Sequence, residues 1–443
     1  MNCKLLVAAS AFGLFAAGSA MAQDIEIATW AGFRKAATSF TFDDGPQSNV
    51  DMAMPMFDKY GYKATFNIVT NWANGGNGQN GMLNWDGVKA LAADGHEIAS
   101  HSDSHPNGTA MPDGEVATSK GTIEGKVTQD YGCITLAYPN CIEPQGVLQH
   151  YIAGRICGNG QEVMGKDGPS NWSQVPAYMT GSTGSYTNTN AFTGAMQQAV
   201  NKGGWVMFLT HGFTTGTNGY ANYSPTDANA IEGALKWASE NDKDIWVAPF
   251  RNVTMYIKER KAASIDPQDG GSADKISFKL THNIADNISK YDYPLSIRVK
   301  TDWANVQVSQ EGAKLESKVD GGYVYFDAVP NAGLIVVKNG ASAPTSSSSE
   351  EGNSSSSGTL ENSSSSNDPM GVASVPNNFQ FAVFSSDGYI TVSGAQGMNV
   401  TVFNSLGHKL RSTRALGCEQ KVFTGAKGVY IVKVGGQTFK VKL

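Results

Sequence analysis

Short β-rich runs alternate with helix-like stretches from about residue 34 to residue 260. After a strand and a helix, the chain usually forms the next strand of the same sheet, parallel to the first. This alternation therefore predicts a parallel sheet or barrel. The expected strands are 37–42, 64–69, 97–100, 134–137, 205–210 and 245–248. The expected helices are 52–60, 85–94, 114–128, 191–201 and 227–241. The chemistry of such a fold is expected at the carboxyl ends of its strands.

Two short polar strings stand at positions where chemistry is expected. Asp43 and Asp44 follow the apolar run 37–42, which a Gly-Pro turn stops. His101 and His105 are four residues apart, so within one helical turn they would face the same way. Each string alone is also typical of solvated surface groups. Together, one carboxylate and two imidazoles suit a divalent metal with open positions, and the spare carboxylate can accept a proton from water.

A third string, Leu209-Thr210-His211-Gly212, closes another apolar run. The three strings, with 64–66 and 95–100 as supporting matches, resemble the NodB-type polysaccharide deacetylases, carbohydrate esterase family 4. The resemblance extends from about residue 35 to residue 260. It implies a distorted (β/α) barrel, followed in this chain by two small all-β modules.

The resemblance also implies roles for the residues of the three strings. Asp44, His101 and His105 match the family's ligands for one divalent ion, most often Zn or Co. Asp43 matches its general base, and His211 matches the histidine that protonates the leaving group. Three protein ligands leave positions open for water and substrate, as in a catalytic metal site.

In the family, the residue after the proline of the third motif supplies a backbone N–H to the oxyanion. The equivalent stretch here is 136–140, which makes Asn140 the candidate donor and places Tyr138 beside it. Here the chain departs from the family, because Ala137 stands where an arginine that orients the base is expected. The nearest equivalent of the arginine's Asp-Trp partner motif is Asn171-Trp172, in which Trp172 is expected to wall the acetyl pocket.

Loss of both charged partners leaves Asp43 without an obvious orienting group. Arg155 is the nearby cation in the sequence, and we predict that it lies close to the site; the alternative is a solvated surface arginine. If Arg155 orients Asp43, Arg155→Ala is expected to lower turnover tenfold or more, with little change in stability.

Residues 1–22 have the pattern of a secretory signal, with a basic end at Lys4, an apolar run and a small-x-small cleavage site. A secreted or cell-surface location follows, and export permits disulfides. A bridge between Cys141 and Cys157 would close a short loop beside Asn140; Cys133 is the competing partner. The remaining cysteine, Cys418, belongs to a distant region.

The deacetylase-like domain is assigned to 34–262, and three further segments follow it. Residues 272–338 alternate with period two and predict a small all-β module with a packing or spacer role, or alternatively one that binds sugar through Tyr291, Tyr293 and Trp303. Residues 342–369 hold three runs of four serines and predict a flexible linker. Residues 375–443 are β-rich and resemble sorting domains of type IX secretion substrates, or else form an ordinary β-sandwich appendage.

A formal charge of −6 without a basic cluster argues against a nucleic-acid partner. The sequence thus predicts a secreted, monomeric, metal-dependent hydrolase. Its expected substrate is an acetylated polysaccharide, either O-acetyl xylan or an N-acetylglucosamine polymer such as chitin or peptidoglycan. Secretion machinery is an expected partner of the C-terminal domain. The alternatives are a catalytically silent carbohydrate-binding protein on the same fold and a serine esterase, for which the chain has no Gly-x-Ser-x-Gly elbow.

Overall fold

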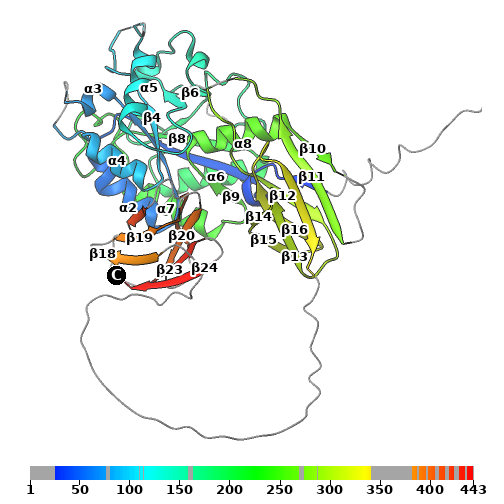
Figure 1. Cartoon of the computed structure of the whole chain (residues 1–443). Coiled ribbons are helices and arrows are strands. Elements are labelled where there is room, and N and C mark those ends of the chain that lie inside the picture. Colours follow the sequence, from blue (N-terminus) through cyan, green and yellow to red (C-terminus); the bar gives the residue numbers. More distant parts are fainter. Residues whose placement is uncertain are drawn as a thin grey trace, which may run out of the picture. The chain divides into compact units, whose positions relative to one another are not determined.

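A computed structural model describes two parts of the chain, residues 25–340 and 382–442. The first part omits 76–79, 109, 113, 158–162, 269–273 and 287; the second omits 387–388, 396–397, 405–408, 415–418, 424–428 and 435–436. The chain divides into two compact units, Met1–Thr345 and Ser346–Leu443 (Figure 1). The predicted signal segment 1–22 and the predicted linker 342–369 lie outside the described residues.

The first unit is built on a parallel sheet with the strand order β6-β5-β4-β3-β2-β8-β7, and β9 pairs additionally with β2. All of its pairings are parallel. The strands are β2 (Ala36–Phe42), β3 (Thr65–Ile68), β4 (Glu97–Ser100), β5 (Thr135–Ala137), β6 (Ala153–Arg155), β7 (Tyr178–Met179), β8 (Trp205–Thr210) and β9 (Ile245–Val247). The predicted α/β class with a parallel sheet is confirmed.

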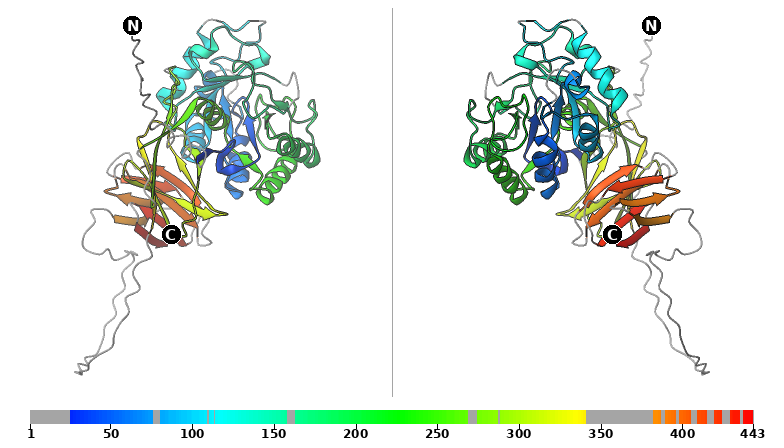
Figure 2. Two further views of the ribbon diagram at one scale, coloured as in Figure 1. Left: turned by 90° about the vertical axis from the view of Figure 1, so that its right-hand side faces the viewer. Right: turned by 90° about the vertical axis from the view of Figure 1, so that its left-hand side faces the viewer.

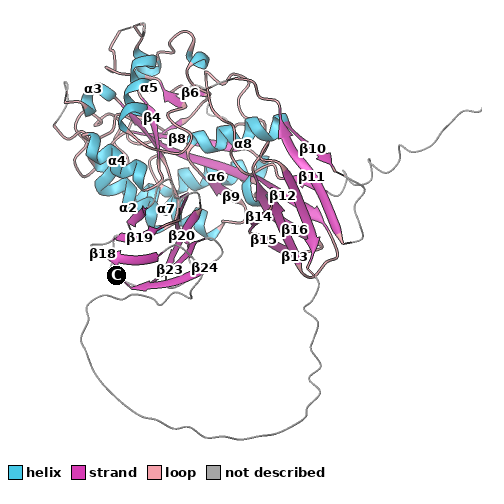
Figure 3. Cartoon of the chain, in the orientation of Figure 1, coloured by secondary structure: helices cyan, strands magenta, loops and turns pink. Residues whose placement is uncertain are grey.

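Helices surround this sheet (Figure 3). They are α2 (Met54–Lys59), which follows a π turn at Asn49–Ala53, α3 (Thr70–Ala73), α4 (Trp85–Ala93), α5 (Glu115–Lys126), α6 (Thr189–Lys202), α7 (Ala228–Glu240) and α8 (Phe250–Ala262). The first residues of α4, α6 and α7 are capped by the side chains of Asn84, Asn188 and Asp227. Such caps satisfy backbone N–H groups that have no partner within the helix.

Alternation along β8 divides the apolar core between the two faces of the sheet. Val206 and Phe208 belong to the cluster that includes residues of α2, α4, α5, α6 and α7. Trp205 and Met207 belong to the cluster that includes residues of α8. Because both faces are covered, all seven residues of β2 are buried, as expected for a central strand of a parallel sheet.

Strand β7, helix α8 and the short helix α3 were not anticipated from the sequence. The first is only two residues long. Helix α8 buries residues on nearly all sides, including the charged Arg251 and Glu259, so its sequence has no clear apolar stripe.

A strand-rich module completes the first unit (Figures 2 and 3). One antiparallel sheet has the order β1-β12-β16-β15, and the other has the order β10-β11-β17-β13-β14. Their strands are β1 (Ile25–Ile27), β10 (Ala263–Pro267), β11 (Lys275–His282), β12 (Leu295–Lys300), β13 (Val306–Gln310), β14 (Ala313–Leu315), β15 (Ser317–Asp320), β16 (Tyr323–Ala328) and β17 (Leu334–Asn339). The sheets therefore include β1 and β10, which precede the range 272–338 predicted for this module.

The aromatic residues suggested for sugar binding in this module are used in packing. Tyr291 is buried and donates its hydroxyl to Asp286 Oδ2 at 2.7 Å. The ring of Tyr293 packs against Trp246 and Tyr256, and Trp303 packs against the apolar core that the module shares with α8. Tyr291 is therefore not available to stack on sugar, whereas Tyr293 and Trp303 are partly buried, and the alternative that they bind sugar stays a prediction.

The second unit is antiparallel, with the strand orders β18-β19-β22 and β21-β20-β23-β24. Its strands are β18 (Ala382–Ser386), β19 (Tyr389–Ser393), β20 (Asn399–Asn404), β21 (Lys409–Arg414), β22 (Glu419–Phe423), β23 (Val429–Val434) and β24 (Gln437–Lys442). Val392, Val402 and Val432 lie in its apolar core. In the described parts of both units, no helix has the length and apolar character needed to cross a membrane.

Candidate active site

The adjacent carboxylates Asp43 and Asp44 lie at the carboxyl end of β2, the central strand of the sheet. Asp43 still pairs as a strand residue, donating its backbone N–H to Thr210 O at 2.8 Å. Asp44 has a φ of 74°, in the left-handed region, and Gly45 follows with 78°. This turn lets two consecutive carboxylates point to the same side, whereas a regular strand would point them to opposite faces of the sheet. Both side chains line one cavity of about 690 Å³.

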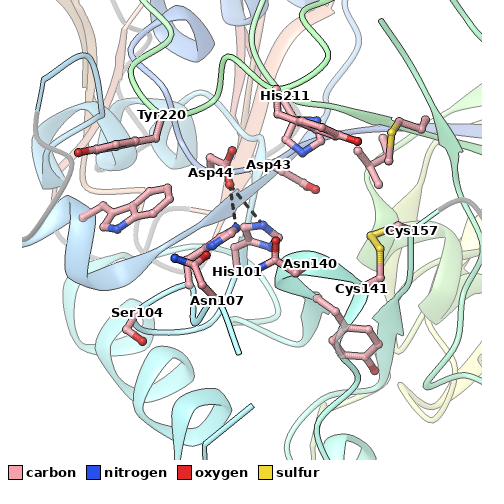
Figure 4. Close-up of a pocket in the computed structure, with 16 residues that line it drawn as sticks. Asp43, Asp44, His101, Ser104, Asn107, Asn140, Cys141, Cys157, His211 and Tyr220 are labelled. Atoms are coloured by element: carbon pink, nitrogen blue, oxygen red, sulfur yellow. Dashed lines mark ion pairs between the residues drawn. A yellow bond between two sulfur atoms is a disulfide. The ribbon is translucent and has the colours of Figure 1, made fainter. Parts of the chain in front are cut away.

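Asp44, His101 and His105 bring one possible ligand atom each to within 4.8 Å of one another. Figure 4 shows Asp44 and His101 pointing toward each other. Asp44 Oδ1 lies 3.4 Å from His101 Nε2 and 3.5 Å from His105 Nε2. His101 Nδ1 lies 2.9 Å from Ala137 O, which places the proton on Nδ1 and turns the lone pair of Nε2 toward the carboxylate. Asp44 Oδ1 is buried and has no hydrogen-bond partner in the described part of the chain. A buried anionic oxygen beside two imidazole lone pairs fits a divalent cation.

The two histidines do not share a helical turn, and that expectation is wrong. Residues 101–105 form a tight loop after β4, in which Ser102 and His105 have φ values of 61° and 53°. The Ser102 hydroxyl accepts the His105 N–H at 3.1 Å, and Glu115 accepts hydrogen bonds from the backbone N–H groups of Asp103 and Ser104. The loop, rather than helical periodicity, turns both imidazoles toward Asp44.

Asp43 is held by a buried cation, Arg155. Arg155 Nη2 donates to Asp43 Oδ1 at 2.6 Å and also contacts Oδ2, while Asn67 Nδ2 donates to Oδ1 at 2.8 Å. Burial alone would raise the pKa of Asp43, but Arg155, with His101 and His211, lowers it well below its ordinary value. Asp43 is therefore ionised at neutral pH, as a general base must be.

The prediction that Arg155 lies at the site is confirmed, and the solvated alternative is wrong. Arg155 is the last residue of β6 and pairs in register with Ala137 of β5. The guanidinium thus comes from the strand next to the position where the family resemblance led us to expect an arginine. Asn171 is exposed and accepts the Ser173 N–H at 3.0 Å, so it has no part in holding the base.

His211 follows β8 and lines the same cavity as Asp43 and Asp44. Its Nδ1 atom is buried without a hydrogen-bond partner among the described residues. The ring of Tyr223 meets the His211 ring edge to face, with 5.3 Å between centroids. His211 is thus placed beside the two carboxylates with a nitrogen free to exchange a proton.

The turn that carries Asn140 is constrained by a disulfide. Pro139–Cys141 form a 3₁₀ turn in which Asn140 and Cys141 have φ values of 53° and 63°. Cys141 is bonded to Cys157, as predicted, and both line the cavity. Asn140 also lines it and donates its side-chain amide to Pro106 O at 3.0 Å. Cys133 is buried and free, whereas Cys418 lies outside the described residues.

The other two predicted pocket residues differ in their placement. Tyr138 lines the cavity, but its hydroxyl donates to Ser173 O at 2.6 Å. Trp172 is not among the described residues of the cavity wall; its ring lies against Lys258 of α8, with Nζ 4.9 Å from the centroid. The expectation that Trp172 walls an acetyl pocket is therefore not met, because its ring lies against Lys258 instead.

Residues of the site that were not found from the sequence include Asn67, Trp72, Tyr220 and Tyr223. Asn67 had a weak signal, since it is an amide within the apolar strand β3, where a buried polar group needs a partner. The two tyrosines lie in a loop rich in Gly, Asn, Ser and Thr, whose composition gives no indication of where their side chains point.

Comparison with known proteins agrees with this site. Residues 32–129 match the family model described as polysaccharide deacetylase. This segment is similar to polysaccharide deacetylases. The matched range includes Asp43, Asp44, His101 and His105, whereas Arg155 and His211 lie beyond it. Residues 370–442 match a domain of unknown function, so the resemblance of this region to a type IX sorting domain is not confirmed.

Among curated proteins, a gellan lyase of a Bacillus species is 26% identical in an alignment of 355 residues, and the match covers 72% of this chain. The chain spans 13% of the length of that relative. Among solved structures, the CE4 domain of a multidomain xylanase from the hindgut metagenome of Trinervitermes trinervoides is 18% identical, with a TM-score of 0.32. The match covers 49% of this chain and 89% of that one. A peptidoglycan deacetylase of Bacillus subtilis is 15% identical, with a TM-score of 0.33 and coverage of 51% and 94%.

Proposed function

We propose that the protein is a secreted, metal-dependent polysaccharide deacetylase that hydrolyses acetyl groups of an extracellular polysaccharide. The observation that carries the proposal is the convergence of Asp44, His101 and His105 beside a second carboxylate, Asp43, in one cavity. The pairing of Asp43 with Arg155 is what a base needs to stay ionised when it is buried.

Asp44, His101 and His105 are the residues that would hold the ion. A divalent cation supplies Lewis-acid chemistry, which polarises the acetyl carbonyl and makes water more acidic. The three side chains do not discriminate between Zn, Co and other divalent ions, because imidazole and carboxylate suit several of them.

The remaining residues account for the proton transfers. Asp43 accepts a proton from the water whose oxygen attacks the acetyl carbon, and Arg155 with Asn67 fixes the orientation of the carboxylate. His211 donates a proton to the oxygen or nitrogen of the sugar as its bond to the acetyl carbon breaks. Acetate and the free hydroxyl or amine are the products. The turn at Asn140 borders the place where negative charge develops, and a backbone N–H there would stabilise it.

Substrate class and location are inferred from several features. The match to the deacetylase family and the similarity to a protein named gellan lyase support a polysaccharide substrate. Both O-acetyl xylan and N-acetylglucosamine polymers fit the proposed chemistry. The signal-like segment 1–22 supports secretion, and the β-rich segment 375–443 is proposed to contact secretion machinery.

The test is acetate release from acetylxylan and from N-acetylchitooligosaccharide, measured on protein stripped by chelation and then reloaded with one metal at a time. The expected result is activity that is lost with the metal and restored by it. Asp43→Asn is the matched control, since it should keep the metal and lose turnover by several orders of magnitude. A chelator-insensitive activity would point to a serine esterase. No acetate release, with retained binding of oligosaccharide, would point to a silent carbohydrate-binding protein.

A further inference from the structure

Two tyrosines of one loop are unusually exposed for large side chains. Tyr220 and Tyr223 are 63% and 56% exposed, the highest values among the large hydrophobic side chains of the described residues. Both line the cavity that holds Asp43 and Asp44. Single exposed aromatic residues are common, but two at the rim of one catalytic cavity are a candidate binding surface.

The loop that carries the tyrosines is held by buried polar side chains at both ends. Asn218 is 7% exposed, donates to Phe213 O at 2.6 Å and accepts the Phe213 N–H and the Ser48 hydroxyl. Ser224 is 3% exposed, donates to Thr180 O at 2.7 Å and accepts the Thr183 N–H. Between these anchors, Gly219 has a φ of 54° and lies so close to the backbone of Asn80 and Gly81 that a Cβ would collide with it. The exposed rings are therefore presented from a constrained backbone, which lowers the entropic cost of using them in binding.

The two rings contact different residues of the site; Figure 4 shows Tyr220 on the side of Asp44 away from the Cys141–Cys157 disulfide. The Tyr220 ring lies 5.6 Å from the Trp72 ring, which stacks on His105 at 5.1 Å, so an aromatic row leads from the rim to a metal-ligand candidate. The Tyr223 ring contacts His211, the proton donor of the proposed reaction. A sugar whose acetyl group reaches Asp43 would have these two aromatic surfaces beside it.

The charge of the surroundings restricts what the rings bind. Residues 212–226 contain no charged side chain, and no Lys or Arg lines the cavity among the described residues. Two carboxylates, Asp43 and Asp44, lie at its base. Arg155 pairs with Asp43, and Asp44 would hold the metal ion, so these charges are not left at the rim. A carboxylate of a polymer bound beside the tyrosines would be desolvated without a cation among the described lining residues. A neutral glycan has no such cost, and the apolar C–H faces of its sugar rings can pack on aromatic rings.

We infer that the cavity has two stacking subsites, one formed by Tyr220 with Trp72 and the other by Tyr223. They bind neutral sugar rings adjacent to the acetylated residue and thereby select an uncharged oligosaccharide over a small acetyl ester. This inference rests on the proposed deacetylase function and adds the substrate class to it.

The test compares kcat/KM on acetylated xylohexaose and N-acetylchitohexaose with kcat/KM on p-nitrophenyl acetate, which has no sugar ring. For Tyr220→Ala and Tyr223→Ala, the ratio of hexasaccharide to small-ester kcat/KM is expected to fall about three- to tenfold, mainly through a higher KM, since an aromatic contact contributes roughly 0.5–1.5 kcal/mol. In Tyr220→Phe and Tyr223→Phe the ratio of hexasaccharide to small-ester kcat/KM should stay close to the wild-type value, because the ring face is retained. Leu148→Ala is the matched control, since Leu148 is 43% exposed and lies outside this cavity.

Other outcomes would overturn the inference. An unchanged ratio in both alanine variants would show that the rings do not bind sugar, and an equal loss on both substrates would assign them a structural or catalytic role. Strong competitive inhibition by a carboxylated, unacetylated oligosaccharide would contradict the preference for neutral glycans. If the wild-type protein releases no acetate, the proposed function fails, but calorimetric titration with neutral xylohexaose still tests the subsites. Binding weakened by the alanine variants would then support them, and equal binding would refute them.

Discussion

Replacing Arg155 by alanine removes the only charged group that donates hydrogen bonds to Asp43 in the described structure. A hydrogen bond to a charged group contributes roughly 1.5–3 kcal/mol. If that energy orients and ionises the base, turnover should fall about 10- to 150-fold, at roughly 1.4 kcal/mol for each factor of ten. Because the pKa of Asp43 is lowered by Arg155 despite burial, its loss should also move the acidic limb of the pH–rate profile to higher pH.

The structure revises the expected effect of this substitution on stability. Arg155 is 1% exposed and Asp43 is 3% exposed, so the substitution would leave a buried carboxylate without its cation. Breaking such a pair costs roughly 3–5 kcal/mol, unless the remaining partner becomes protonated. The sequence-based expectation of little change therefore no longer holds, and the thermal midpoint should fall together with turnover.

The assay is steady-state acetate release below the unfolding transition, with metal content measured on each sample. Arg155→Lys keeps the charge but not the planar guanidinium, so its turnover should lie between those of the wild type and Arg155→Ala. Because Ala137 and Arg155 are paired in register, the double variant Ala137→Arg with Arg155→Ala returns the cation to the neighbouring strand and should recover part of the activity. An Arg155→Ala protein that is folded, holds metal and turns over at the wild-type rate would refute the reasoning.

Three further predictions follow from the structure. His101→Ala should lose bound metal and activity together, because two ligands hold the ion poorly; metal analysis of the purified variant checks this, and full metal retention would contradict it. Burial raises the pKa of Glu259 to about 8, with Asp292 adding to the rise, while the Tyr293 N–H opposes it. Because Glu259 ionises less readily in the folded than in the unfolded state, the free energy of unfolding should fall as pH rises from about 4.5 to 8, by at most roughly 5 kcal/mol. Glu259→Gln should reduce this dependence in denaturant titrations at pH 5 and 9. A chain ended at Gly340 keeps all strands of the first unit and should match the full-length kcat on a small acetyl ester; a large loss would place the C-terminal unit in the catalytic machinery.

Much of the sheet, and the three residues that form the candidate metal site, could be predicted because both depend on local patterns. The apolar runs that became β4 and β8 were assigned with the same ends that the structure has, since polar residues and turns bound them. The Cys141–Cys157 bridge was also within reach, because it closes a short loop. The orientation of His101 and His105 was not, since a spacing of four residues suits a helix as well as the positive-φ loop that the chain adopts.

The sequence by itself determined which chemical groups are available: two adjacent carboxylates after a buried strand, two histidines and a third histidine after another strand. Only the tertiary structure decided which cation serves Asp43, because the answer depends on the register that sets Arg155 of β6 beside Ala137 of β5. It likewise placed Trp172 on α8 and brought Tyr220 and Tyr223 to the rim. These outcomes depend on how distant segments pack, and side-chain direction in a loop is set by anchors such as Asn218 and Ser224 rather than by local composition.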